Sequence, residues 1–112
     1  MLSCSKPNEI IELERLGIIK GLVANGCMDY SKKVRDFIAD GRYGTNDLRS
    51  CVLTANDIHK IETDELEVAV DGNKYVIFGR DTFGNPFYAC GKIVLGADSR
   101  RLYFFVTAHE RS

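Results

Sequence analysis

The chain of 112 residues has no excess of charge of either sign, because 15 lysines and arginines face 16 aspartates and glutamates. A near-neutral chain does not bind nucleic acid through bulk charge, although a local basic pocket can still hold one phosphate. Long apolar runs are also missing, and the stretch at 102–108 is far shorter than the ~20 residues that a membrane-spanning helix needs. Pro7 and Glu9 precede the apolar positions that begin at Ile10, unlike the continuous apolar region of a signal peptide. We therefore expect a cytoplasmic protein with no membrane segment.

Closely spaced metal ligands are lacking too. The four cysteines are scattered as Cys4, Cys27, Cys51 and Cys90, with no Cys-x-x-Cys pair, and the chain has two histidines. A structural zinc site needs ligand pairs close together. The chain also has no Walker-type phosphate loop, dinucleotide glycine pattern or metalloprotease helix motif. We expect reduced thiols, no metal and no cofactor, although the spacing by itself does not exclude disulfides.

What is present is the balance of an ordinary globular domain, with 45% hydrophobic and 28% charged residues. The length fits one compact domain spanning 1–112. Within it we predict an extra N-terminal helical segment at 1–28, helices over 29–62 and an antiparallel sheet over 65–109.

Capping residues and helical spacing predict two to three helices in the first half. Pro7 suits the first turn of a helix that Asn25 and Gly26 end. Asp29 and Ser31 are candidate caps for a second helix, and Thr45 for a third.

The hydrophobic period changes to two in the second half. Alternating or apolar positions predict strands at 66–70, 75–78, 87–95 and 102–108, with Gly91 a candidate bulge. Short turns between them indicate an antiparallel meander of four strands. The last run is nearly continuous, so we expect a central strand buried on both faces. Helices before strands are typical of an α+β fold, with the helices covering one face of the sheet.

Two residues stand out as candidates for chemistry. Arg80 lies where a strand leaves the sheet, and a guanidinium there can hold a phosphate bidentately. The alternative is a surface ion pair with a carboxylate such as Asp81. His109 ends the last strand and can transfer protons near neutral pH, unless it is simply a solvated histidine.

Further basic and aromatic positions suggest RNA contacts. Lys32, Lys33 and Arg35 cluster on the second predicted helix, where a solvated helix face is the ordinary alternative. Tyr75 and Thr107 lie on strands, and sheets with exposed aromatics bind single strands. Packing and backbone hydrogen bonds are the alternatives for these two residues.

Two segments, Tyr-Val-Ile-Phe-Gly-Arg-Asp-x-x-Gly at 75–84 and Phe-Val-Thr-Ala-His at 105–109, resemble a bacterial family of small domains often encoded beside zinc-finger antitoxins. That family is similar to toxins of the RelE/ParE and MqsR type. The stretch at 31–48 also resembles its Ser-x-His-Ala-x-x-Arg helix, turn and second capped helix. The likeness spans 30–110 and leaves the N-terminal segment outside.

The resemblance implies a RelE-like fold, with helices packed on a four-stranded antiparallel sheet, and metal-independent cleavage of RNA at a 2′-hydroxyl. The family's helix histidine falls on Lys33 and its arginine on Phe37, so that helix departs from the pattern. Arg80, Thr107 and His109 remain as matches. The implied catalytic set is Arg80, His109 and Lys33.

Two main hypotheses follow. The first is a toxin-like endoribonuclease of a toxin–antitoxin system, with RNA as substrate and an antitoxin as partner. The second is a non-catalytic module of the same fold that binds another protein or forms a homodimer, since exposed sheet edges readily pair with another chain. A thiol-based redox or metal sensor has little support from the cysteine spacing, and a small-molecule enzyme stays open.

Overall fold

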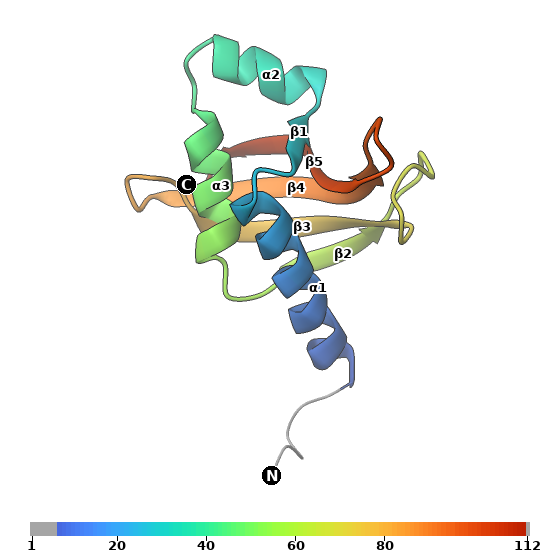
Figure 1. The fold of residues 1–112 in the computed structure, drawn as a ribbon. Helices are drawn as coiled ribbons and strands as arrows, with labels where there is room; N and C mark the ends of the chain where they lie inside the picture. Colours follow the sequence, from blue (N-terminus) through green and yellow to red (C-terminus); the bar gives the residue numbers. More distant parts are fainter. Residues whose placement is uncertain (1–6, 112) are drawn as a thin grey trace.

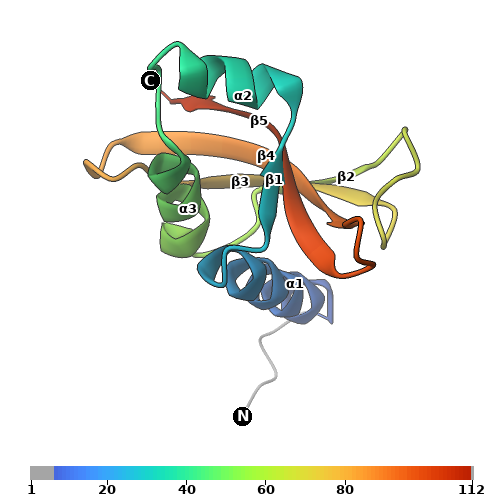
Figure 2. The ribbon, with the colours of Figure 1, turned by 45° about the horizontal axis from the view of Figure 1, so that its top comes forward.

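The computed structural model describes residues 7–111 and has an α+β architecture of three helices and a five-stranded sheet (Figure 1). The elements follow in the order α1 (Pro7–Ala24), β1 (Met28–Tyr30), α2 (Lys32–Ala39), α3 (Thr45–Thr54), β2 (Lys60–Thr63), β3 (Asn73–Arg80), β4 (Pro86–Leu95) and β5 (Arg101–Glu110). The helices lie on one side of the sheet, with α1 and α2 against β5 and α3 against β3 and β4 (Figure 1 and Figure 2).

Local capping explains where two of the helices begin. The Ser31 hydroxyl accepts a hydrogen bond from the first turn of α2 and donates one to the Val106 carbonyl at 2.7 Å, which ties the helix start to β5. The cap of α3 is Gly44 and not the predicted Thr45. The Gly44 amide donates to the Asp47 carboxylate at 2.9 Å, so the acid in the first turn takes over the capping role.

The predicted four-stranded antiparallel meander is wrong, because the sheet has five strands in the order β1-β5-β4-β3-β2 and is mixed. Strand β1 pairs in parallel with β5, Met28 opposite Tyr103, and the other neighbours are antiparallel. A three-residue strand is too short to show a period, so β1 was not predicted. The predicted strand at 66–70 is not a strand; β2 at Lys60–Thr63 takes the edge position instead.

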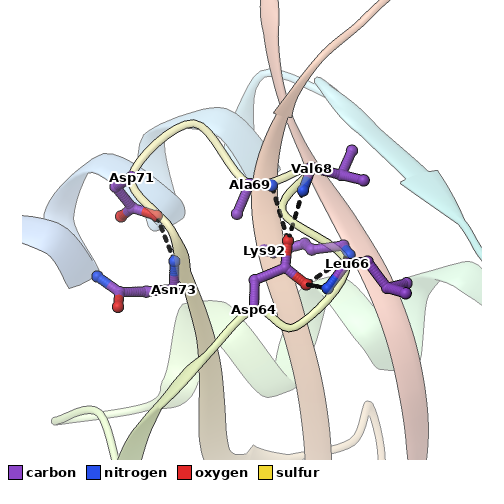
Figure 3. A network of polar contacts seen from close by, with 7 residues as sticks. All are labelled: Asp64, Leu66, Val68, Ala69, Asp71, Asn73 and Lys92. Carbon is purple, nitrogen blue, oxygen red and sulfur yellow. Dashed lines mark hydrogen bonds and ion pairs between the residues drawn. The ribbon is translucent and has the colours of Figure 1, made fainter.

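A buried carboxylate prevents the segment after β2 from forming a strand (Figure 3). Asp64 accepts hydrogen bonds from the amides of Val68 at 2.9 Å and Ala69 at 2.8 Å, and a longer one from Leu66. Its other partner is Lys92, whose Nζ lies 3.0 Å away. Amides bonded to a side chain cannot also pair along a strand, so this segment forms turns despite its alternating pattern.

The core lies between the helices and the sheet, and close backbone approaches shape it. A Cβ on Gly79 would lie 1.8 Å from the Cys51 carbonyl oxygen, so α3 rests directly on β3. The Tyr103 ring covers Gly91 in the same manner. The bulge predicted near Gly91 is confirmed by a register shift beside it. The strand buried along nearly its whole length is β4, whose face away from the helices is covered in part by the loop that carries Asp64. Strand β5 alternates instead, so its burial on both faces was wrongly predicted.

Candidate site on the open face of the sheet

The strand register brings a row of side chains together on the sheet face that the helices do not cover, which we call the open face. Phe78 pairs with Tyr88, and Tyr88 pairs with His109, so these side chains point to the same side. Their neighbours Ile77 and Ala89 point to the helices and are fully buried. The other end of the open face lies beneath the loop that carries Asp64.

The aromatic groups of this row contact one another. The rings of His59 and Phe78 stack with centroids 3.9 Å apart, and those of Tyr88 and His109 stack at 4.4 Å. The guanidinium of Arg111 lies 3.7 Å from the centre of the Phe78 ring. Two groups this near to one ring centre must occupy its two faces, so His59 and Arg111 enclose Phe78. We call these five residues the aromatic row.

Two arginines line a pocket at the Phe78 end of the row. Arg80 and Arg111 line one pocket of about 300 Å³, together with Phe78. The Arg80 Nη1 donates to the Gly84 carbonyl at 2.8 Å, which holds the exposed side chain beside the β3–β4 turn. Asp57 also lines this pocket and is the one acid among its lining residues. A pocket with two guanidiniums and one acid favours an anionic group such as phosphate.

His109 lies at the other end of the row and is exposed. Its Nδ1 lies 2.9 Å from the Glu110 carbonyl oxygen. A carbonyl oxygen only accepts, so this contact assigns the proton of a neutral ring to Nδ1 and leaves Nε2 free as a base. The ring also lines a pocket of about 350 Å³ with Phe37, Arg42 and Tyr43.

The structure brings together two of the three residues predicted to be catalytic. Arg80 and His109 lie at the same end of the open face, two strand spacings apart across the sheet and two residues apart along it, which separates their Cα atoms by about 12 Å. Arg111 lies between them, since it lines a pocket with each. Lys33 lies exposed on α2 and lines none of these pockets.

The predicted RNA contacts on α2 have local partners. Lys32 forms an exposed ion pair with Asp36 at 3.0 Å. Arg35 pairs with Asp29 at 3.3 Å. Exposed pairs of this kind are common on solvated helix faces, and RNA binding by these two residues stays a prediction.

Tyr75 and Thr107 differ in their access to a ligand. Tyr75 is fully buried on the helix-covered face, and its hydroxyl donates to the Asp71 carboxylate. Burial and that carboxylate raise the pKa of Tyr75 to about 12. It therefore cannot stack on a base. Thr107 is half-buried on the open face, opposite Cys90 and two residues before His109.

Sequence reasoning missed most of the aromatic row. The missed members are His59, Phe78, Tyr88 and Arg111. A signal was present for one of them, because a period of two counted back from Arg80 places Phe78 on the same face. Tyr88 and His59 could not be placed without the register.

Within residues 7–111 no group of three or more histidines, cysteines, aspartates or glutamates is arranged to hold a metal ion. In the same part of the chain, no helix has the length and apolar character to cross a membrane. No protein-family model, curated protein or solved structure matches the chain.

Proposed function

We propose that this chain binds single-stranded RNA on its open face in the cytoplasm, and that it cleaves the bound strand in the manner of the RelE/ParE-type toxins that parts of its sequence resemble. One observation carries the proposal: the aromatic row ends at a pocket that Arg80 and Arg111 share. In this pocket two arginines lie beside the Phe78 ring, which itself stacks on His59.

The binding part rests on complementary chemistry. A guanidinium donates two parallel hydrogen bonds to a phosphate, and two guanidiniums in one pocket can hold a single backbone phosphate between them. Unpaired bases stack on aromatic and imidazole rings. His109 also borders a second pocket, together with Arg42 and Phe37. A base stacked there lies at one end of the row and a phosphate at the other.

The cleavage part rests on His109 and Arg111, which line one pocket with Phe78 and Tyr88. The His109 Nε2 takes the proton of the 2′-hydroxyl as the 2′-oxygen attacks the adjacent phosphorus. The bond from phosphorus to the 5′-oxygen breaks, and that oxygen takes a proton from a water molecule, whose hydroxide then receives the proton that His109 took up. The Arg111 guanidinium stabilises the charge that develops on the phosphate oxygens. The products are a 2′,3′-cyclic phosphate and a free 5′-hydroxyl.

Binding is tested by fluorescence anisotropy with a labelled single-stranded RNA at several salt concentrations. Loss of a charged hydrogen-bond partner costs about 1.5–3 kcal/mol, so we expect Arg80→Ala and Arg111→Ala to bind roughly 10- to 100-fold more weakly, with a shallower salt dependence. The matched control is Arg100→Ala, since Arg100 is equally charged, 87% exposed and located in the β4–β5 turn. Equal binding by all three variants would contradict the proposed site.

Cleavage is tested on the same RNA by gel electrophoresis and end-group analysis. We expect the wild type to produce 2′,3′-cyclic phosphate ends. We expect His109→Ala to bind the RNA more weakly, because a stacking ring is lost, and to leave the RNA intact even at protein concentrations that saturate it. Cleavage at the same rate by both proteins would refute the role of His109. Binding without cleavage by the wild type would reduce the proposal to its RNA-binding part.

The non-catalytic protein-interaction module remains a second candidate, because one observation favours it. A pocket of about 450 Å³ at the other end of the open face is bordered by Leu66, Val68 and Leu95, which are 76%, 57% and 59% exposed. Exposed apolar clusters of this kind commonly mark protein contacts. Light scattering after size-exclusion chromatography tests it for homodimers: a dimer that Leu66→Glu converts to monomer supports this candidate, and a monomeric wild type removes the homodimer from consideration.

A further inference from the structure

Phe83 sits at the tip of the turn between β3 and β4 with 85% of its side chain exposed. It is the most exposed of the large hydrophobic side chains in the described residues. Turn tips usually carry small or polar residues, because an aromatic ring at such a position stays in contact with water and is not stabilised by burial. The Phe83 ring is therefore free to contact a ligand.

The turn that carries Phe83 is tightly constrained. The buried Asp81 carboxylate accepts hydrogen bonds from the amides of Phe83 and Asn85, each at 2.9 Å. The Gly84 amide donates to the Asp81 carbonyl, and Gly84 has a φ of 84°, as in a hairpin closed by a type I turn and a left-handed glycine. The ring is thus presented on a fixed backbone, and binding through it loses little conformational entropy.

The turn is also anchored to the helix layer. The Thr82 amide and hydroxyl both donate to one Asp47 oxygen, at 3.0 and 2.7 Å. Since Asp47 also caps α3, the turn cannot fold back over the core. The only other side chain that reaches the turn from the open face in the described contacts is Arg80, through its bond to the Gly84 carbonyl.

We propose that Phe83 stacks on the RNA base next to the phosphate held by Arg80, which extends the binding site beyond the aromatic row to the turn between β3 and β4. This inference rests on the proposed function. Arg80 and Phe83 are three residues apart, so their Cα atoms lie within about 10 Å. That reach suits one nucleotide, whose phosphate meets the guanidinium while its base, or the base beside it, meets the ring. The cationic neighbour selects a nucleic acid over an apolar protein pocket as the occupant.

The chain contains no tryptophan, which gives the test a direct readout. The variant Phe83→Trp places a single indole at the tip, and stacking on a base quenches its fluorescence. We expect quenching by single-stranded RNA and unchanged fluorescence with a ribose-phosphate chain that lacks bases. We also expect Phe83→Ala to bind RNA roughly 5- to 100-fold more weakly than the wild type, the range of one lost base stack.

The matched control is Leu66→Trp, since Leu66 is 76% exposed at the opposite end of the sheet and its indole should not respond to RNA. Full affinity of Phe83→Ala with no quenching of Phe83→Trp, while Arg80→Ala still loses affinity, would overturn the role of Phe83 and leave the proposed function standing. A wild type that binds no RNA would overturn both. Retention of RNA affinity by Phe83→Ala combined with loss of an oligomer would also overturn the inference and assign the ring to a protein contact.

Discussion

Replacing Asp64 by asparagine should destabilise the protein more than removing the charge of an acid or base in any of the other ion pairs. Asp64 and Lys92 form the one ion pair of the described residues that is buried, with side chains 1% and 5% exposed; every other paired side chain is at least 39% exposed. Asp64→Asn removes the charge and leaves Lys92 buried without a counter-ion. Breaking a buried pair in this way costs about 3–5 kcal/mol of unfolding free energy.

The lowered pKa of Asp64 gives a second, independent value for the stability that the ionised carboxylate contributes. Burial by itself raises this pKa, but the amides of Ala69 and Val68 and the Lys92 ammonium outweigh burial and lower it from 3.8 to about 2. A shift of this size corresponds to about 2 kcal/mol of stability. Because the pKa is lower in the folded state, this stability is present above the unfolded pKa near 4 and is lost as the pH falls toward 2. About half of it should be gone at pH 3.

The assay is urea unfolding of wild type and Asp64→Asn between pH 7 and pH 3. The matched control is Asp98→Asn, since Asp98 pairs with Arg100 on the surface and its loss should change stability by less than about 1 kcal/mol. The double variant Asp64→Asn with Lys92→Met should recover part of the loss, because methionine removes the unpaired charge. Equal costs for Asp64→Asn and Asp98→Asn, or a difference from wild type that does not shrink below pH 4, would refute this reasoning.

Two further changes probe the packing of α3 on β3. Gly79→Ala should lower the free energy of unfolding by at least about 1–3 kcal/mol, because the added methyl group clashes with the Cys51 carbonyl and α3 must shift. The loss is measured as a lower midpoint of urea unfolding. An unchanged midpoint would show that the helix shifts without loss of stability. Cys51 is fully buried, and burial raises the pKa of its thiol to about 12. A thiol reagent should therefore modify the half-buried Cys27 in the folded protein and Cys51 only after unfolding. Rapid labelling of Cys51 in the folded protein would contradict this packing.

The residues near Asp64 show why an alternating pattern did not produce a strand. Leu66, Val68 and Val70 have the spacing of a half-buried strand but are 76%, 57% and 43% exposed. The pattern describes side chains, whereas a strand also needs free backbone amides, and the Asp64 carboxylate occupies three of them. That carboxylate is held in place by Lys92, which is distant in sequence. No local signal contains this information.

The residues of the candidate site also differ in whether the sequence alone could identify them. Arg80 and His109 could be named from the sequence because each is a polar group at the end of an apolar run. Tyr75 was predicted to contact RNA on residue type alone, but the strand register places its side chain in the core. Register also decided that Phe78 and Tyr88 share a face with His109, since a shift by one residue would have reversed every side chain.

The sequence by itself determined the α+β class, the order of helices before the main hairpins, and most helix ends and turns, because capping residues, glycines and hydrophobic periods act over a few residues. Only the tertiary structure decided that the sheet is mixed and five-stranded, since β1 exists through its pairing with β5 across more than seventy residues of chain. Only the tertiary structure assembled the aromatic row with Arg80, because its members come from separate strands and loops and meet through strand register. Contacts between residues far apart in the chain depend on the whole fold, and a local pattern cannot encode them.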